Sequence, residues 1–196
     1  MNRLPPAPKE AQEQVREELA FAASIMGFEP NSMKMMAHRP EILRGFLGFI
    51  GAILGPDALV DGGLRQLIAH IASAAAGCNY CQAHTAHGAH NRGVEAQKIE
   101  AVWDYENNDL FSDAERAALR LAQAAGSVPN LATDEHFETA RQFYSQAEIT
   151  EIVAVVSAFG FLNRWNDTLA TTLEDSPLAF ADGHLTQGGW HKGKHG

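Results

Sequence analysis

The sequence predicts an all-α fold, and three observations carry this prediction. Apolar side chains recur at steps of three and four residues through most of the chain, which is the period of a helix with one buried face. No stretch alternates apolar and polar residues beside the turn chemistry of a hairpin. Ser112-Asp113-Ala114-Glu115 and Ser145-Gln146-Ala147-Glu148 are capping boxes, in which serine and glutamate bond the free backbone N–H groups at a helix start.

The first half of the chain is predicted to hold five helices after a Pro-rich, extended arm over residues 1–8. Gly27 and Gly77 follow apolar helical segments, where helices favour glycine, and Pro40 suits a first helical turn. The Met-rich second segment is assigned to the core, because methionine usually fills irregular gaps there. In chain order the five segments are 9–26, 31–37, 40 to the break at Gly55, 64–76 and 79–91.

The second half is predicted to hold four further helices. The first, over residues 95–105, should turn Ile99, Val102 and Trp103 inward. The others cover 112–125, 133–144 and a long segment that begins at Ser145.

Two features of this half leave alternatives open. The polar, Gly-rich tail over residues 177–196 carries apolar anchors such as Trp190, and it either wraps a neighbouring subunit or frays. The helix around Gln66 resembles the helix around Glu151, which would fit two pseudo-repeated helical halves or chance.

Composition excludes several classes of function. An apolar fraction of 45% and a charged fraction of 20% are typical of a globular protein, and a single domain over residues 1–196 is expected. The net charge of −9 argues against nucleic acid or an anionic membrane as a partner. No apolar run reaches the ~18–20 residues that span a bilayer. Because residues 1–6 hold no apolar signal segment, a cytoplasmic location is expected.

The stretch that carries chemistry is a CxxC pair. Cys78 and Cys81 are the only two cysteines, and His84, His87 and His90 follow at the same three-residue spacing. In a cytoplasmic chain such a pair is more often a functional dithiol or half of a metal site than a structural disulfide. A helix that starts after Gly77 would place the first cysteine at a helix N-terminus, which favours its thiolate.

Helical geometry limits which of these side chains can meet. A three-residue step turns by about 300°, so Cys81 and His84 can touch but the whole series cannot face one point. A zinc site would need Cys78, Cys81 and His84, with His87 or His70 as the fourth ligand. Structural zinc sites usually show a second ligand pair distant in sequence, and this sequence holds no further cysteine, so thiol redox chemistry is favoured and no metal is expected.

At these residues the sequence resembles a known family. An Ala-rich helix followed by Gly77-Cys78-x-Tyr80-Cys81-x-Ala83-His84 is similar to the alkylhydroperoxidase AhpD and carboxymuconolactone decarboxylase superfamily, and most to its peroxidase-related branch. The resemblance extends to residues 111–116 and 161–167 and covers roughly residues 40–172. It implies an AhpD-like helical domain that assembles as a homo-oligomer, either a dimer, a trimer or a hexamer.

The resemblance also implies a reaction cycle without a bound cofactor. Peroxide would oxidise Cys81 to a sulfenic acid, and Cys78 would resolve it as a disulfide. An external dithiol such as dihydrolipoamide, or a thioredoxin-type protein, would then reduce the pair. The helix-dipole argument instead favours Cys78 as the attacking thiolate, so the two lines of reasoning disagree on this point.

The sequence departs from the family pattern at two places. The family carries Glu twelve residues before the first cysteine, where this chain has Gln66, which cannot exchange a proton near neutral pH. The family histidine four residues after the second cysteine is Thr85 here, and the imidazole stands one position earlier, as His84. His70, one turn after Gln66, is a candidate replacement for the lost acid–base group, and Glu151 is a more remote one.

The sequence therefore predicts a thiol-dependent peroxidase that reduces hydrogen peroxide or alkyl hydroperoxides. One alternative is a redox-sensing or interaction module that is oxidised without turnover. Another is a carboxymuconolactone decarboxylase-type enzyme, a branch that does not depend on a CxxC pair. A peroxide, a dithiol reductant and further copies of the chain are the expected partners. The predicted catalytic residues are Cys81, Cys78, His84, Gln66, His70 and His87.

Overall fold

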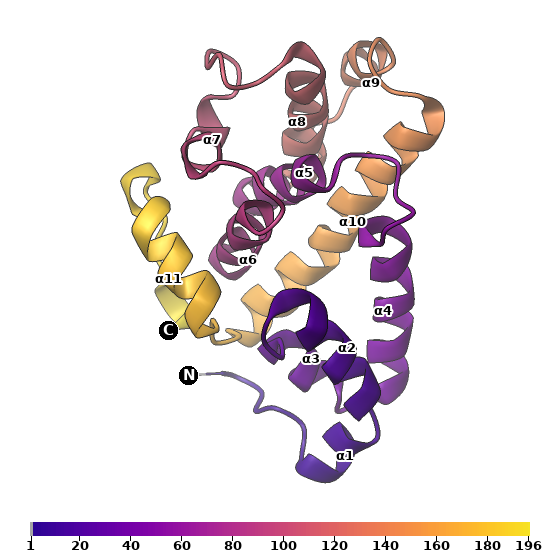
Figure 1. The fold of residues 1–196 in the computed structure, drawn as a ribbon, viewed down its shortest axis with the longest axis vertical. Helices are drawn as coiled ribbons and strands as arrows, with labels where there is room; N and C mark the ends of the chain where they lie inside the picture. Colours follow the sequence, from indigo (N-terminus) through magenta and orange to yellow (C-terminus); the bar gives the residue numbers. More distant parts are fainter. Residues whose placement is uncertain (1) are drawn as a thin grey trace.

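The computed structural model describes residues 2–196, and over that range the chain is helical and contains no strand (Figure 1), as predicted. Three short 3₁₀ turns, η1 (Val102–Asp104), η2 (Thr186–Gly188) and η3 (Gly193–His195), join the helices. The helices in chain order are α1 (Lys9–Glu13), α2 (Arg16–Met26), α3 (Asn31–Met36), α4 (Pro40–Leu54), α5 (Gly62–Ala75), α6 (Asn79–His90), α7 (Ala96–Glu100), α8 (Asp113–Gly126), α9 (Asp134–Ala140), α10 (Gln146–Leu169) and α11 (Asp175–His184).

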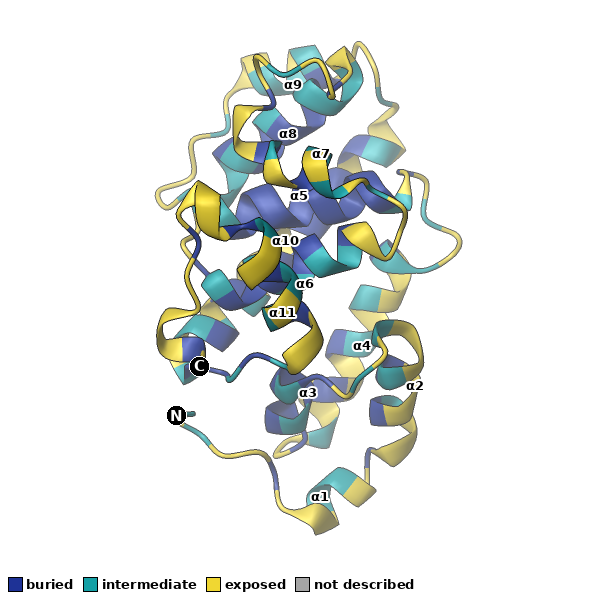
Figure 2. Ribbon diagram, turned by 60° about the vertical axis from the view of Figure 1, so that its left-hand side comes forward, coloured by how far each residue is buried: buried dark blue, intermediate teal, exposed yellow. Residues whose placement is uncertain are grey.

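Helix α5 is the centre of the molecule. All residues from Gly63 to Ser73 are buried, in agreement with its Ala- and Ile-rich sequence (Figure 2). It packs against α6, α8 and α10, and the Asp61 side chain caps its start by accepting a bond from the Leu64 N–H at 3.0 Å. Gly77, at φ +76°, ends the following turn, so that α6 begins directly at the cysteine pair.

The close approach of α8 to α5 depends on Gly126. A Cβ atom at this position would lie 2.7 Å from the Ala72 Cα and 2.8 Å from the Ala72 carbonyl oxygen. Both are backbone atoms of the central helix, which cannot move without displacing α5.

Replacing Gly126 with alanine is therefore expected to lower the free energy of unfolding by about 1–3 kcal/mol, the usual cost of overpacking. Urea titration of both variants measures this. The control is Gly45→Ala in the middle of α4, where a Cβ would meet nothing within 4 Å. There the higher helix propensity of alanine should raise stability by about 0.5–1 kcal/mol. Equal effects at the two sites would contradict the packing argument.

The helices α1 to α4 form a second apolar cluster beside the main core. Val15, Leu19, Met36, Leu43 and Phe46 are buried in it. The cluster joins the main core through the partly buried side chains of α4 and α10 that contact both. The methionines of α3 are buried, which confirms their assignment to the core.

Three predicted helices are shorter or more divided than expected. The segment 9–26 is two helices, because Val15 leaves the helical conformation (φ −127°, ψ 24°) with its side chain fully buried. The segment 95–105 divides into α7 and η1, and Trp103 is 47% exposed, so its predicted inward position is wrong. Ile99 and Val102 are buried as predicted, and α9 ends four residues before the predicted Tyr144.

The tail is the largest difference from the prediction. Residues 175–184 form α11, which packs against α6 of its own chain. Farther along the tail, η3 also packs against α6. Trp190 is buried and donates its indole N–H to the Asn79 carbonyl at 2.9 Å. The apolar anchors thus fold onto the chain itself, and the tail is not frayed. The pseudo-repeat and the homo-oligomer stay predictions. Within residues 2–196, no helix combines the length and apolar character needed to cross a membrane.

Candidate functional site

A cavity of about 460 Å³ lies between the N-terminal helices and α6. Its walls are mostly apolar side chains from α2, α3, α4, α10 and the loop after α2, including four phenylalanines, Phe21, Phe28, Phe46 and Phe159. The polar groups gather on the α5 and α6 side, where Cys81, His84, His87, Gln66 and Thr85 reach the cavity. An apolar chamber with a few convergent polar groups is the usual form of a small-molecule site.

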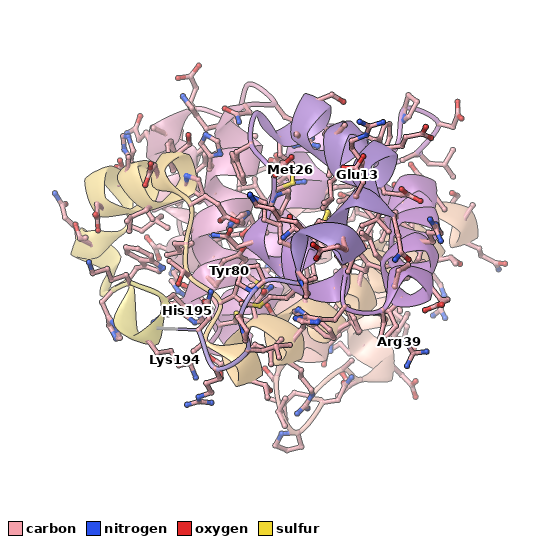
Figure 3. The ribbon with its side chains drawn as sticks, turned by 90° about the horizontal axis from the view of Figure 1, so that it is seen from below. Glu13, Met26, Arg39, Tyr80, Lys194 and His195 are labelled. Carbon is pink, nitrogen blue, oxygen red and sulfur yellow. The ribbon has the colours of Figure 1, made fainter. Side chains whose placement is uncertain are left out.

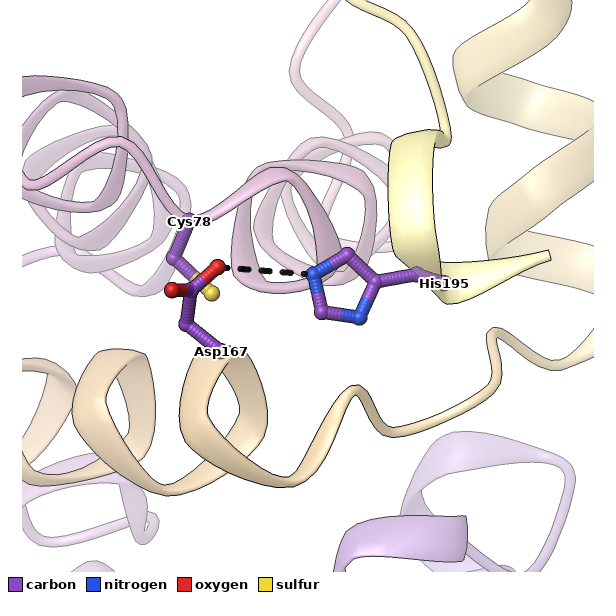
Figure 4. Close-up of side chains that lie close together, drawn as sticks. All are labelled: Cys78, Asp167 and His195. Atoms are coloured by element: carbon purple, nitrogen blue, oxygen red, sulfur yellow. Dashed lines mark ion pairs between the residues drawn. The ribbon is translucent and has the colours of Figure 1, made fainter. Parts of the chain in front are cut away.

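The two cysteines lie one helical turn apart at the start of α6, with their side chains hydrogen-bonded to each other and both residues buried. Cys81 lines the cavity, whereas Cys78, the N-cap residue of α6, is fully buried against Asp167 and His195 (Figure 4). Both cysteines are free thiols. A substrate in the cavity therefore meets Cys81 first, and Cys78 lies one helical turn behind it.

The surroundings of the two thiols shift their pKa values in opposite directions. A hydrogen bond with the Cys81 side chain is the main cause that lowers the pKa of Cys78, despite its burial. Burial, followed by the hydrogen bond with Cys78, raises the pKa of Cys81 well above its ordinary value. Asn166 counters this in part, since its side-chain N–H donates to the Cys81 sulfur at 3.6 Å. Of the two, Cys78 is thus the more acidic thiol, and a proton must leave Cys81 before it can attack.

A buried carboxylate orients His84. Glu174, the residue before α11, lies 2.6 Å from the His84 Nε2, and it accepts bonds from the Tyr80 hydroxyl at 3.0 Å and from the Asn31 backbone N–H. Burial raises the pKa of Glu174, but the charge and hydrogen bond of His84 and the bond from Asn31 outweigh this and lower it. The ionised carboxylate fixes the proton of His84 on Nε2. The Tyr80 ring stacks on the imidazole at 4.3 Å between centroids.

The other predicted site residues divide into two groups. Gln66 and His87 reach the cavity, and burial lowers the pKa of His87. His70 instead bonds the Gln82 carbonyl at 3.0 Å and the Thr85 hydroxyl at 3.1 Å, and burial lowers its pKa to about 4. It is a neutral residue that joins α5 to α6. Glu151 accepts two backbone N–H bonds from the loop before α5 and does not line the cavity.

Sequence reasoning missed Glu174, Asn166, Asp167 and His195. Glu174 is 90 positions from His84, and Asn166 is 85 positions from Cys81, so no local spacing marks them. Glu174 is the N-cap residue of α11, but glutamate is not among the types favoured at that position, so no helix-start signal marked it either.

The zinc set considered from the sequence is not gathered in residues 2–196. Within that range one group brings three potential metal-binding side chains together: the donor atoms of Cys78, Asp167 and His195 lie within 4.8 Å of one another. The Lys194 ammonium bonds the same Asp167 carboxylate at 2.7 Å, and this fixed positive charge opposes a second cation. The group is better suited to holding a proton than a metal ion.

Comparison with known sequences finds relatives of this chain. Residues 40–124 match the carboxymuconolactone decarboxylase family. The chain is 29% identical over 122 residues to the uncharacterized protein YnjA of Escherichia coli K12, an alignment that covers 62% of this chain and 66% of that one. The chain thus spans about two thirds of this curated relative.

Solved structures cover more of the chain. A complex of a cysteine-to-alanine variant of the debrominase Bmp8 with 2,3,4-tribromopyrrole is 31% identical, with a TM-score of 0.85 over 92% of this chain and 96% of that one. The AhpD-core, peroxidase-related protein of Ralstonia eutropha JMP134 shares the fold, with a TM-score of 0.81 and 24% identity over 94% of this chain and 97% of that one. The chain belongs to the carboxymuconolactone decarboxylase family, and its fold is that of the AhpD core.

Proposed function

We propose that this protein is a dithiol reductase whose Cys81 and Cys78 pass two electrons to a small organic substrate in the cavity. The observation that carries the proposal is the placement of the pair, with Cys81 in the cavity wall and Cys78 bonded behind it. The cavity is larger and more apolar than hydrogen peroxide requires. An alkyl hydroperoxide, with an apolar body and one reducible O–O bond, fits this environment better.

The reaction would proceed in two steps. The Cys81 thiolate attacks the terminal hydroperoxide oxygen, the O–O bond breaks, and the alcohol leaves with a proton, giving a sulfenic acid. Cys78 then attacks the Cys81 sulfur, the S–S bond forms, and the hydroxide leaves as water. His84, oriented by Glu174 at the cavity wall, is the group placed to accept the Cys81 proton before the attack and to return it to the alkoxide. An external dithiol of the dihydrolipoamide or thioredoxin type returns the two electrons.

A second substrate class is favoured by one observation, the similarity to the debrominase Bmp8 over 92% of this chain. The aromatic walls of the cavity would suit a flat halogenated ring as well as a hydroperoxide. The same two electrons would replace a C–Br bond with C–H and release bromide. The protein product, a disulfide between Cys78 and Cys81, is the same in both reactions.

Intact mass and a thiol count of the reduced protein test the proposal. One equivalent of cumene hydroperoxide, hydrogen peroxide or a brominated pyrrole is added in parallel. Loss of two hydrogens and both thiols is expected with an organic substrate, followed by many turnovers with dihydrolipoamide, and a higher kcat/KM for cumene hydroperoxide than for hydrogen peroxide. Oxidation once without turnover would favour the redox-sensing module. Thiols that stay unreactive would contradict the proposal, and lactone-acid turnover after loss of both cysteines would revive the decarboxylase.

A further inference from the structure

A buried histidine on the far side of the cysteine pair has no role in the steps above. His195, in η3, is 1% exposed and lies beside Tyr80 and Lys194 (Figure 3). Its Nδ1 bonds the Thr171 carbonyl at 2.8 Å, whereas its Nε2 is buried without a hydrogen-bond partner. Because a carbonyl only accepts, Nδ1 carries the proton and Nε2 presents a lone pair. A buried polar atom left unpaired destabilises the fold, so its position calls for an explanation.

The free nitrogen faces the reactive thiol pair. Nε2 lies 3.7 Å from the Asp167 Oδ1, and the Cys78 sulfur completes a group whose donor atoms are within 4.8 Å of one another (Figure 4). One water molecule or a small rotation of Cys78 would complete a hydrogen bond across this distance. Since Asp167 offers only acceptor oxygens, the Cys78 thiol is the proton donor of this group.

The charges around the imidazole suit a group that gains and loses a proton. Asp167, from α10, stabilises a positive ring, while Lys194, bonded to the same carboxylate, opposes it. On the α6 side, His195 lies beside Cys78, which is hydrogen-bonded to Cys81, and beside Tyr80. The ring centroids of Tyr80 and His195 are 5.8 Å apart. Burial is the main cause that lowers the pKa of His195, which keeps the ring neutral and ready to accept at neutral pH.

We propose that His195 is the proton acceptor for Cys78, with Asp167 as a positioning residue that holds the imidazolium. As the S–S bond forms, the Cys78 thiol proton passes to Nε2, the bond between the Cys81 sulfur and its hydroxyl breaks, and the departing hydroxide takes a proton from the solvent and leaves as water. When an external dithiol reduces the disulfide, Cys78 departs as a thiolate and recovers its proton from the imidazolium. Gln66 cannot serve here, because an amide does not exchange protons near neutral pH and because it lies on the cavity side.

This inference rests on the proposed dithiol cycle, but it can be tested without the natural substrate. The aromatic disulfide 4,4′-dithiodipyridine releases one thiopyridone when Cys81 attacks it and a second when Cys78 closes the protein disulfide. The second phase therefore reports the step assigned to His195. A protein that turns over neither hydroperoxides nor halogenated rings would still give both phases, so the two proposals can fail separately.

The informative variant is His195→Asn, which keeps a donor near Nδ1 for the Thr171 carbonyl and removes Nε2. At neutral pH it should slow the second phase by about 100-fold, the lower range of general-base effects, and leave the first phase unchanged. The defect should shrink as rising pH ionises Cys78 without help. His191→Gln, an exposed histidine of the same tail, is the matched control and should change neither phase.

Three results would overturn the proposal. One is a second phase that His195→Asn leaves unchanged, and another is a slowing that is equal at every pH, which would indicate a structural role. The third is a stoichiometric zinc ion, found by elemental analysis and lost in the variant. If the variant does not fold, the wild-type profile decides, because a second phase that rises tenfold per pH unit through neutrality would show closure by Cys78 without a base.

Discussion

Replacing Cys81 with serine is expected to abolish turnover with every substrate, a loss of at least about a thousandfold, as for other nucleophile deletions. The reason is geometric, because Cys81 is the thiol in the cavity wall and Cys78 is fully buried behind it. Cys78→Ser should instead react once, giving a sulfenic acid on Cys81 that dimedone traps as a mass increase. Substrate consumption with dihydrolipoamide and intact mass measure both outcomes.

The two single variants also control each other, since the chain holds no third cysteine to confuse the thiol count. A reversed result, with Cys81→Ser reacting once and Cys78→Ser inert, would make Cys78 the nucleophile. The lowered pKa of Cys78 and its place at the start of α6 favour that assignment, whereas access to the cavity favours Cys81. The two variants therefore decide whether thiol acidity or access to the cavity determines which cysteine is the nucleophile.

The helices that the sequence predicted correctly are those whose ends are marked by capping or turn residues at the ends themselves. Ser112 and Ser145 accept from the N–H groups three residues later, and Gly77 turns the chain at φ +76°, as their residue types indicate. The tail had no such signal. Its fold depends on anchors such as Trp190 finding α6, a contact between segments far apart in the chain, which a periodicity argument does not contain.

The candidate site likewise has a part that the sequence predicted and a part that it did not. Cys78, Cys81 and His84 lie within two helical turns, so their spacing was enough to predict a dithiol with a neighbouring imidazole. The groups that tune them, Glu174 and Asn166, are brought in by α10 and the segment after it. The sequence does not show which polar residues will be partners when they are so many positions apart, because only tertiary packing brings them to the thiols.

Glu174→Gln is expected to lower both the stability of the fold and the rate of catalysis. The carboxylate joins His84, Tyr80 and the Asn31 backbone, and the side chains of the His84 pair are each only 10% exposed. Loss of its charged hydrogen bonds should lower the free energy of unfolding at pH 7 by about 1–3 kcal/mol. It should also reduce kcat by about tenfold or more, because His84 loses its fixed orientation.

The loss of stability in Glu174→Gln is expected to depend on pH. Glu174 has a pKa below its ordinary value of 4.5 in the folded chain, so its contribution is fully present above that value. It is lost as the pH falls through the folded pKa, because the unfolded chain then binds the proton first. The stability difference between wild type and Glu174→Gln, measured by urea titration, should therefore shrink on acidification from neutral pH to below 4.5.

Glu100→Gln is the matched control, since Glu100 also pairs with a histidine, His184, at 2.7 Å, but with both side chains more than a third exposed. Solvent screening should keep its effect within about 0.5 kcal/mol. Equal losses in the two variants would mean that any Glu–His pair acts alike here, and that burial of Glu174 contributes nothing. A loss confined to Glu174→Gln would instead identify the carboxylate as the contact that joins the N-terminal helices and α11 to the histidine beside Cys81.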